Sequence, residues 1–371
     1  MTAERYMQTA TMADDSVCYR YNPPKEVIEA GVVVSKYIGN DYDEALAYCV
    51  EQNLAMDVWR KEMKRLHHLS KDSRVEDIVK VYMLSHMYTT LAPKTQVDYA
   101  LCLNSWKTQI VVGTLLHKAK ASALTAPACQ QLYDRAVSKG KVSQANHTLA
   151  VYKVVFNFAI NRGYITHNVF AGVKRIQTKS RRVTWNREHI RAFLNVAYSR
   201  YEWRNIGMIV NMAYEWGQRL GDMRVLLWSS YNFDTGVLTL TQSKRRATVK
   251  LPTSEGLQAM LKQQHDSFGW QPYIAPSITK KAGGGLKPYS ITRISVIGNS
   301  IMEEAQLPEE LQLMDLRRTA ITEMVEEGVP VTSIMALSGH ATPNSLTPYI
   351  KHTQAAAQRA QDMRKFPERL I

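Results

Sequence analysis

Four side chains in the C-terminal half have the chemistry to hold an anion and attack it. Gly217-Gln218-Arg219 places an arginine directly after a helix break, where an apolar or capping residue would be usual. An arginine there favours an anionic ligand, because its planar guanidinium can donate to two oxygens at once. Arg317 opens a later helix, and Leu337-Ser338-Gly339-His340 closes another. Tyr349, whose hydroxyl is a potential nucleophile, follows His340 by nine positions (349 − 340 = 9).

A helix and a hairpin are expected to position the first of these residues. Apolar residues recur at helical spacing from Ile206 to Ala213, and this helix breaks at Gly217. Two strand-like runs, Val237 to Thr241 and Ala247 to Leu251, then predict a β-hairpin. The predicted hairpin presents three cations at its tip, which are Lys244, Arg245 and Arg246.

A proline precedes the tyrosine. Pro348 fits the first position of a helix, which predicts Thr347 as the N-cap and Tyr349 in the first turn. The positive end of the helix dipole would then favour a phenolate and a phosphate.

The N-terminal half predicts two domains. A strand-like run from Val32 to Ile38, a turn at Gly39-Asn40-Asp41 and a following helical pattern indicate a small α+β unit over residues 1–72. Ser73-Arg74-Val75-Glu76 has the pattern of a capping box and marks the start of the next domain. Residues 73–173 show one helical pattern after another, the last stopping at Gly163, and predict a compact helical domain.

Residues 174–182 form a basic segment without apolar periodicity. Its cations suit a linker that lies along phosphates, and a charged linker surrounded by solvent is an equal alternative. The candidate nucleic-acid contacts are Lys174, Arg175, Lys179, Arg181 and Arg182 in this segment, with Arg245 and Arg246 at the hairpin tip. A mixed domain over residues 183–353 and a C-terminal tail over residues 354–371 complete the predicted organisation.

The composition is basic and indicates no membrane span. The 371 residues include 47 Lys and Arg against 33 Asp and Glu, a net charge of +14. This charge is typical of a protein that binds nucleic acid, and equally of a merely basic surface. Without a long apolar run or the layout of a signal peptide, the sequence predicts a cytoplasmic protein. The four cysteines lack metal-ligand spacing, so we expect reduced thiols and no metal site.

The motifs together resemble the tyrosine recombinase (phage integrase) family. The segment Gly217 to Asp222 is similar to the family's first arginine motif, and Lys244 to its hairpin lysine. Met314 to Arg317 is similar to the family's His-x-x-Arg motif. Leu337 to His340 and Tyr349 are similar to its last two motifs.

The detailed resemblance covers about residues 183–353, and a looser one covers residues 73–172. It implies a mainly α fold with small β elements: a multidomain DNA clamp with a helical core-binding domain and a mixed α+β catalytic domain. Residues 1–72 resemble the arm-site-binding region of phage integrases, and the tail 354–371 would exchange between protomers. The implied partner is double-stranded DNA, on which four copies of the chain would hold two duplexes. Accessory DNA-bending or directionality proteins would assist, and the location would be the nucleoid of a bacterial host cell.

The resemblance also implies DNA cleavage and rejoining through a 3′-phosphotyrosine. Arg219 and Arg317 would hold the non-bridging oxygens of a phosphodiester, and His340 would add a third donor. Tyr349 would attack phosphorus, and Lys244 would give the departing 5′ oxygen its proton. No cofactor is implied, because the arginines supply the positive charge.

Met314 departs from the family pattern, which usually has a histidine three positions before the second arginine. A thioether cannot donate a hydrogen bond to phosphate or carry a proton. The departure puts at risk a general acid/base contribution of about 10²–10⁴-fold, unless Arg318 or His352 compensates. Alternatively, Met314 packs into the core beneath the helix of Arg317.

Each residue has an ordinary structural interpretation when taken alone. Arg219 and Asp222, at i and i+3, can form a surface ion pair worth a few tenths of a kcal/mol, whereas in one catalytic site Asp222 would orient an arginine. Lys244 can be a solvated cation and Tyr349 a half-buried aromatic. One site explains their order and spacing better than several coincidences.

Two rival functions belong to other classes. One is a DNA-binding or architectural relative that has lost activity, for which Met314 is the only support in the sequence. The other is a type IB topoisomerase-like enzyme that relaxes supercoiled DNA as a monomer. Trapping of covalent protein–DNA adducts distinguishes an active recombinase from the inactive relative. Relaxation of a plasmid without a target site would support the topoisomerase-like enzyme.

Overall fold

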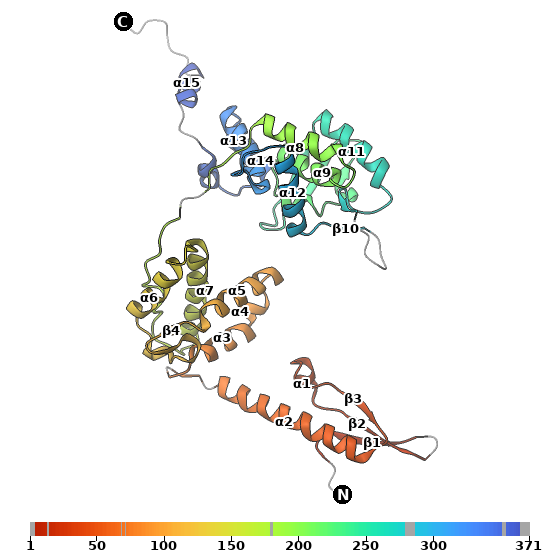
Figure 1. The fold of residues 1–371 in the computed structure, drawn as a ribbon, viewed down its shortest axis with the longest axis vertical. Helices are drawn as coiled ribbons and strands as arrows, with labels where there is room; N and C mark the ends of the chain where they lie inside the picture. Colours follow the sequence, from red (N-terminus) through yellow and green to blue (C-terminus); the bar gives the residue numbers. More distant parts are fainter. Residues whose placement is uncertain are drawn as a thin grey trace. The chain divides into compact units, whose positions relative to one another are not determined.

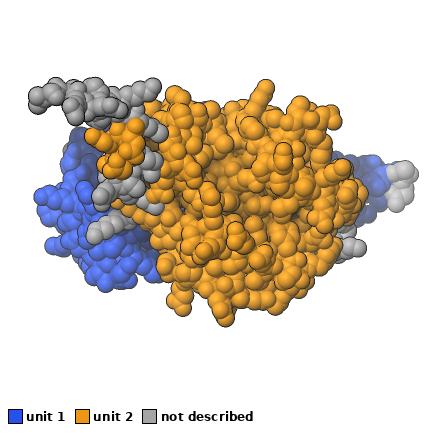
Figure 2. Space-filling model, turned by 90° about the horizontal axis from the view of Figure 1, so that it is seen from above, with its two compact units in different colours: residues 1–179 blue, residues 180–371 orange. Residues whose placement is uncertain are grey.

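The computed structural model divides the chain into two compact units, Met1–Lys179 and Ser180–Ile371 (Figures 1 and 2). It describes residues 4–12, 15–67, 69–70, 72–178, 181–278, 286–350 and 354–363. The boundary between the units falls inside the basic segment 174–182. Lys179 and His352, which were candidates from the sequence, lie outside the described residues, as do residues 364–371 of the tail.

The N-terminal part of the first unit is a three-stranded antiparallel sheet packed against a long helix (Figure 1). Its elements are β1 (Met7–Thr11), β2 (Val17–Tyr21), α1 (Lys25–Glu29), β3 (Lys36–Gly39) and α2 (Tyr42–His67). Tyr21 and Cys49 are fully buried in the core of this part. The predicted strand from Val32 is wrong at its start, because the Val32 N–H closes the turn after α1 by donating to Val27 O (3.2 Å).

The second part of this unit is helical and has a core of its own. Its elements are α3 (Val75–Leu84), α4 (His86–Thr89), α5 (Pro93–Lys107), β4 (Ile110–Val111), β5 (Thr114–Leu115), α6 (Ala126–Val137) and α7 (Val142–Asn161), with 3-10 turns at Leu116–Lys118 and Ala121–Ala123. Tyr152 of α7 is buried and stacks on Trp106 of α5, with ring centroids 5.5 Å apart. Helix α7 ends just before Gly163, whose left-handed backbone (φ 73°) confirms the predicted stop.

The capping box predicted at Ser73 is wrong. Arg74 is the N-cap of α3, and its side chain makes no capping hydrogen bond. The Ser73 hydroxyl accepts instead from the Ser70 N–H (2.8 Å), while the Ser73 N–H donates to Ser70 O (2.9 Å). These reciprocal bonds close a turn, which competes with the cap for the same hydroxyl.

The second unit combines helices with small antiparallel sheets. Its elements are α8 (Arg187–Ser199), α9 (Arg204–Glu215), α10 (Leu220–Met223), β6 (Tyr231–Asn232), β7 (Val237–Thr241), β8 (Thr248–Pro252), α11 (Glu255–Phe268), β9 (Pro276–Ser277), β10 (Lys287–Pro288), α12 (Ile291–Glu304), α13 (Leu316–Glu326), α14 (Val331–Ser338) and α15 (Gln354–Met363), with 3-10 helices at Trp228–Ser230, Leu313–Asp315 and Pro343–Tyr349. The predicted hairpin is confirmed, since β7 pairs with β8 from Val237 opposite Pro252 to Thr241 opposite Thr248. Among the described residues, the structure holds no helix that is both long and apolar enough to cross a membrane.

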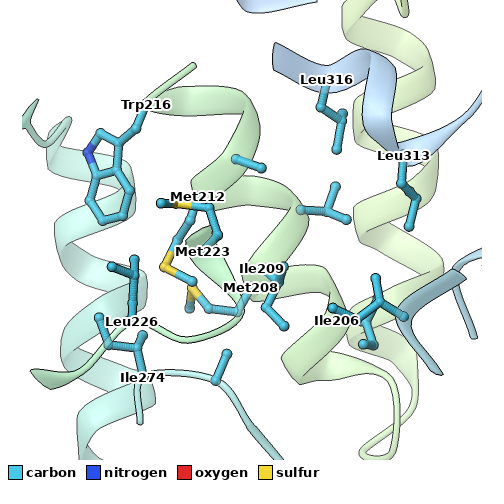
Figure 3. Close-up of a cluster of buried hydrophobic side chains, with 14 of the residues drawn as sticks. Ile206, Met208, Ile209, Met212, Trp216, Met223, Leu226, Ile274, Leu313 and Leu316 are labelled. Carbon is cyan, nitrogen blue, oxygen red and sulfur yellow. The ribbon is translucent and has the colours of Figure 1, made fainter. Parts of the chain in front are cut away.

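Helix α9 runs through the core of the second unit (Figure 3). Its Met208 and Met212 belong to one buried cluster with Met223 of α10 and Leu316 of α13. Trp216, which is 1% exposed, closes the end of the helix against the same cluster. The segment that follows Trp216, and with it the first arginine, is therefore anchored on a closely packed core.

Candidate active site

Arg219 lies at the turn between α9 and α10. The chain reverses at Gly217, which has a left-handed backbone (φ 59°), and Arg219 becomes the N-cap residue of α10. Arg219 Nη1 donates to Gln242 Oε1 (3.4 Å) and lies 3.8 Å from Asp222 Oδ2. Asp222 is only 2% exposed, so the pair is not a surface ion pair. The buried carboxylate lies beside the guanidinium of Arg219, whose side chain keeps 26% of its area exposed.

Arg317 lies in the first turn of α13 and is almost completely buried. Its Nη1 donates to Gly217 O and to Gln218 Oε1, both at 3.2 Å, and its Nη2 donates to Ser338 O at 2.8 Å. Burial, followed by the charge of Arg219, lowers the pKa of Arg317 to about 10, so the guanidinium is still charged at neutral pH. A buried cation held by neutral oxygens favours an anionic ligand.

Two glutamines that the motifs of the sequence did not single out connect the arginines. Gln218 and Gln242 are both fully buried. Gln242 Nε2 donates to Gln218 Oε1 (2.7 Å) and to Ser338 O (2.8 Å). The amide oxygens face the guanidiniums, because Gln218 accepts from Arg317 and Gln242 accepts from Arg219. The sequence offered two hints of this pair: Gln218 directly precedes Arg219, and Gln242 directly follows the first strand of the hairpin.

His340 follows the end of α14 and is 8% exposed. Its Nδ1 lies 2.7 Å from Ser338 Oγ. Burial, and then the charges of neighbouring arginines, of which Arg317 acts most strongly, lower the pKa of His340 to about 4. The ring is therefore neutral at pH 7. When the Ser338 hydroxyl donates to Nδ1, the ring proton is on Nε2, which can donate to an anion.

The predicted local structure around Tyr349 is wrong. Pro348 does not start a helix, because a 3-10 helix already begins at Pro343 with Thr342 as its N-cap. Tyr349 is the last residue of this helix instead of lying in a first turn. The positive end of a helix dipole therefore does not act on its phenol.

Tyr349 packs beside the other candidate residues of the site. Its ring lies edge-on to that of His340, with centroids 5.7 Å apart, and the Arg318 guanidinium is 5.2 Å from its centroid. Arg318 also donates to Pro348 O (3.2 Å), which ties α13 to this helix. Burial lowers the pKa of Arg317 most, and the nearby Tyr349 phenol raises it and so opposes part of that lowering. The structure therefore brings Tyr349, His340 and Arg317 together.

Lys244 lies at the exposed tip of the hairpin. The tip is closed by the Arg246 N–H, which donates to Gln242 O (2.8 Å), and Arg246 has a left-handed backbone (φ 54°). Asp222 Oδ1 accepts from the Ser243 N–H (3.2 Å) and ties the tip to α10. The neighbouring Arg245 is close enough for its charge to contribute to the low pKa of His340.

Met314 is 73% exposed, so the interpretation that it packs into the core is wrong. It lies on a 3-10 helix, Leu313–Asp315, directly before α13. Together with Arg219 and Arg317, Met314 lines a cavity of about 480 Å³. Position 314 therefore faces the same space as the two arginines.

The basic segment divides between the two units. In the first unit, the backbone of Lys174 exchanges two hydrogen bonds with the side chain of Gln130, and the side chains of Lys174 and Arg175 are exposed. In the second unit, Arg181 pairs with buried Asp315 (Nη2 to Oδ2, 2.8 Å) and also donates to Glu310 O. This ion pair gives Arg181 a structural role that the sequence did not predict, whereas Arg182 is exposed.

Within the described parts of the chain, one group of three side chains has the types and proximity of metal ligands. It consists of Asp98, Cys102 and His147, in the helical part of the first unit. His147 Nε2 already lies 2.6 Å from Asp98 Oδ2, and the Cys102 thiol is buried. No such group lies among the described residues around the two arginines.

Comparison with known proteins identifies the family. Residues 186–356 match the phage integrase family. The chain is similar in structure to a lambda integrase dimer bound to a COC′ core site, with a TM-score of 0.62 and 17% identity over 100% of this chain and 99% of that one. It is also similar to a lambda integrase tetramer bound to a Holliday junction (TM-score 0.61, 17% identity, 100% and 99% of the two chains). A Tn1549 transposon integrase in complex with a circular intermediate DNA gives a TM-score of 0.64 and 14% identity over 78% of this chain and 100% of that one. A search of curated proteins gives no match.

Residues 186–356, in the second unit, thus form a domain of the phage integrase family. The predicted fold class is confirmed: the chain is mainly helical, with small antiparallel sheets, and it has the multidomain fold of the lambda integrase structures.

Proposed function

We propose that this protein is a site-specific DNA recombinase that cleaves and rejoins DNA through Tyr349. The Tyr349 phenol loses its proton to solvent as its oxygen attacks phosphorus, and the bond from phosphorus to the 5′ oxygen breaks. The DNA then carries a 3′-phosphotyrosine link and a free 5′-hydroxyl, and attack by a 5′-hydroxyl reverses the step. The phosphotyrosine diester conserves the energy of the broken bond, so rejoining needs no nucleotide cofactor. The two arginines supply the positive charge at the phosphate.

One observation carries the proposal: two arginines from separate elements meet beside a histidine and a tyrosine. Arg219 and Arg317 are joined through the buried amides of Gln218 and Gln242. The Tyr349 ring packs against His340, and its phenol is close enough to Arg317 to raise the pKa of that guanidinium, against the larger lowering caused by burial. This arrangement places a nucleophile next to donors that can hold the charge of a pentavalent phosphate.

The roles of the residues follow from their environments. Arg219 and Arg317 hold the non-bridging oxygens, and neutral His340 donates from Nε2. Asp222 orients Arg219. Lys244, at the exposed hairpin tip, protonates the leaving 5′ oxygen.

The proposed partners are double-stranded DNA and further copies of the chain. The net charge of +14 favours a polyanion, and exposed Lys174, Arg175 and Arg182 are suited to phosphate contacts, as are Arg245 and Arg246. The similar lambda integrase structure is a tetramer on a Holliday junction. We propose the same assembly here, with the tail 354–371 exchanged between protomers. Accessory DNA-bending or directionality proteins are the further proposed partners.

The test is to trap the covalent intermediate. Fragments of the DNA that flanks the gene are incubated with the protein, denatured with detergent, and probed for protein that remains attached to DNA. Adducts at one repeated sequence support the proposal and supply the core site for later assays. Strong DNA binding without any adduct would favour a catalytically impaired relative. Relaxation of a plasmid lacking that sequence would favour a topoisomerase-like enzyme.

A further inference from the structure

The buried amides of Gln218 and Gln242 form the part of the site to which neither the motifs nor the proposed chemistry assigns a role. Every hydrogen-bonding position of the Gln218 amide is used. Its Nε2 donates to Leu337 O (2.7 Å) and Trp216 O (3.1 Å). Its Oε1 accepts from Gln242 Nε2 (2.7 Å) and Arg317 Nη1 (3.2 Å). A primary amide offers two donors and two acceptor lone pairs, so this side chain is satisfied in full.

Gln242 extends the same network to three other parts of the site. Its Nε2 reaches Ser338 O (2.8 Å), two residues before His340. Its Oε1 accepts from Arg219 (3.4 Å). Its backbone N–H donates to Ala247 O (2.9 Å) and so closes the hairpin that carries Lys244. Gln242 thus joins the first arginine and the segment before the histidine through its side chain, and the hairpin through its backbone.

A separate observation, at Gly339, also shows how closely the Gln242 amide packs against the segment before His340. A Cβ at Gly339 would lie 2.7 Å from Gln242 Nε2, closer than real Cβ atoms approach other atoms. The residue next to His340 must therefore be a glycine, both for its left-handed backbone (φ 70°) and for the amide beneath it.

We propose, resting on the function proposed above, that Gln218 and Gln242 are positioning residues. They set both arginines and the segment Ser338–His340 in the arrangement needed for cleavage before DNA binds. An amide suits this role because its oxygen faces the guanidiniums while its NH₂ group faces backbone carbonyls. Donors that are fixed in advance do not need to reorganise as charge develops on the phosphate.

The test compares cleavage with binding in Gln218→Met and Gln242→Met. Methionine keeps much of the volume and removes every amide hydrogen bond. We expect the single-turnover rate of covalent adduct formation on a nicked core-site duplex to fall about 10²-fold, the cost of a displacement of about 1 Å. The Kd for the same duplex should hardly change, because the phosphate contacts on the rest of the DNA remain.

Gln264→Met is the matched control. Gln264 is 2% exposed in the same unit, and its Nε2 donates to Asn205 Oδ1 (2.8 Å) and Ile274 O (2.9 Å). This substitution removes similar buried bonds away from the arginines. It should lower the melting temperature by a comparable amount and leave the cleavage rate at the wild-type value.

Met variants that cleave as fast as Gln264→Met would overturn the positioning role. If the Met variants fail to fold, Gln242→Glu keeps the shape and the acceptor for Arg219 while losing both donors, and it must show the same loss of rate. Failure of the wild-type protein to form any adduct would instead remove the proposed function, and this inference with it.

Discussion

The inner and outer halves of the site are built differently. Arg317, Gln218 and Gln242 form the inner half, where all three are buried and bonded to one another or to backbone carbonyls. Lys244 and Met314 form the outer half, where both are exposed. Tyr349 belongs to the outer half as well, because it is only partly buried at the end of a 3-10 helix.

The difference follows from what each half must do. Stabilising charge on a phosphate requires donors that are already in place, and burial in a polar network provides them. The nucleophile and the proton donor must reach a duplex and leave it again, which an enclosed position would prevent. Substitutions in the inner half are therefore expected to cost stability as well as rate, and those in the outer half to cost rate alone.

The largest effect is expected in the outer half. Tyr349→Phe keeps the ring beside His340 and Arg318 but removes the attacking oxygen, so no covalent adduct should form. DNA affinity and melting temperature should stay close to the wild-type values. Gel-shift titration and adduct trapping on the same preparation check both parts. An adduct formed by the Phe variant would mean that another residue is the nucleophile.

The next largest effect is expected for the arginines. A point charge cannot replace a bidentate donor, so Arg219→Lys and Arg317→Lys should each slow cleavage by about 10²–10³-fold. Only Arg317→Lys should also destabilise the fold, by about 1–3 kcal/mol, because it leaves buried acceptors such as Gly217 O without a partner. Denaturant unfolding of the two variants measures this contrast. Equal stabilities would contradict the expected difference between buried Arg317 and partly exposed Arg219.

Lys244→Ala should lower the cleavage rate by about 10²–10⁴-fold without lowering stability. A substrate whose 5′ bridging oxygen is replaced by sulfur should restore the rate, because a thiolate leaves without a proton. Lys250→Ala, an exposed cation on β8 of the same hairpin, is the control and should cleave normally. A Lys244 variant that stays slow on the sulfur substrate would assign the lysine to phosphate binding.

His340 predicts a pH effect of definite sign. Its pKa is lowered from 6.5 to about 4 in the folded protein, so the unfolded chain binds the proton more readily. The resulting stabilisation is complete above pH 6.5 and is lost as the pH falls through 4. Between pH 7 and pH 4.5, urea unfolding should show a larger loss of stability for the wild type than for His340→Asn. A smaller loss for the wild type would mean that the histidine is not held neutral.

The smallest effect is expected at position 314. Because Met314 is exposed beside both arginines, Met314→His should leave the melting temperature unchanged and keep or raise the cleavage rate. The rate and the melting temperature are measured on the same variant. Slower cleavage at unchanged stability would show that an imidazole at this position obstructs the phosphate.

The sequence predicted the parts of the site that depend on local pattern. The helix break at Gly217 and the hairpin around Lys244 are visible because turn residues and strand alternation are local signals. The setting of Tyr349 was predicted incorrectly, since both Pro343 and Pro348 can start a helix and only packing decides between them.

Contacts between distant residues could not be predicted in the same way. Gln218 and Gln242 are 24 positions apart, and the bond between their amides depends on the tertiary fold. The pairing of Arg181 with Asp315 joins residues that are 134 positions apart. The exposure of Met314 likewise depends on how the 3-10 helix before α13 packs, which its own side chain does not determine.

The most direct test of the account is to locate the covalent bond itself. The adduct trapped on core-site DNA is digested with nuclease and trypsin, and the modified peptide is sequenced by mass spectrometry. We expect a nucleotide attached through its 3′-phosphate to Tyr349, on the peptide that follows Arg318. A nucleotide found on any other residue, or an adduct linked through a 5′-phosphate, would contradict it.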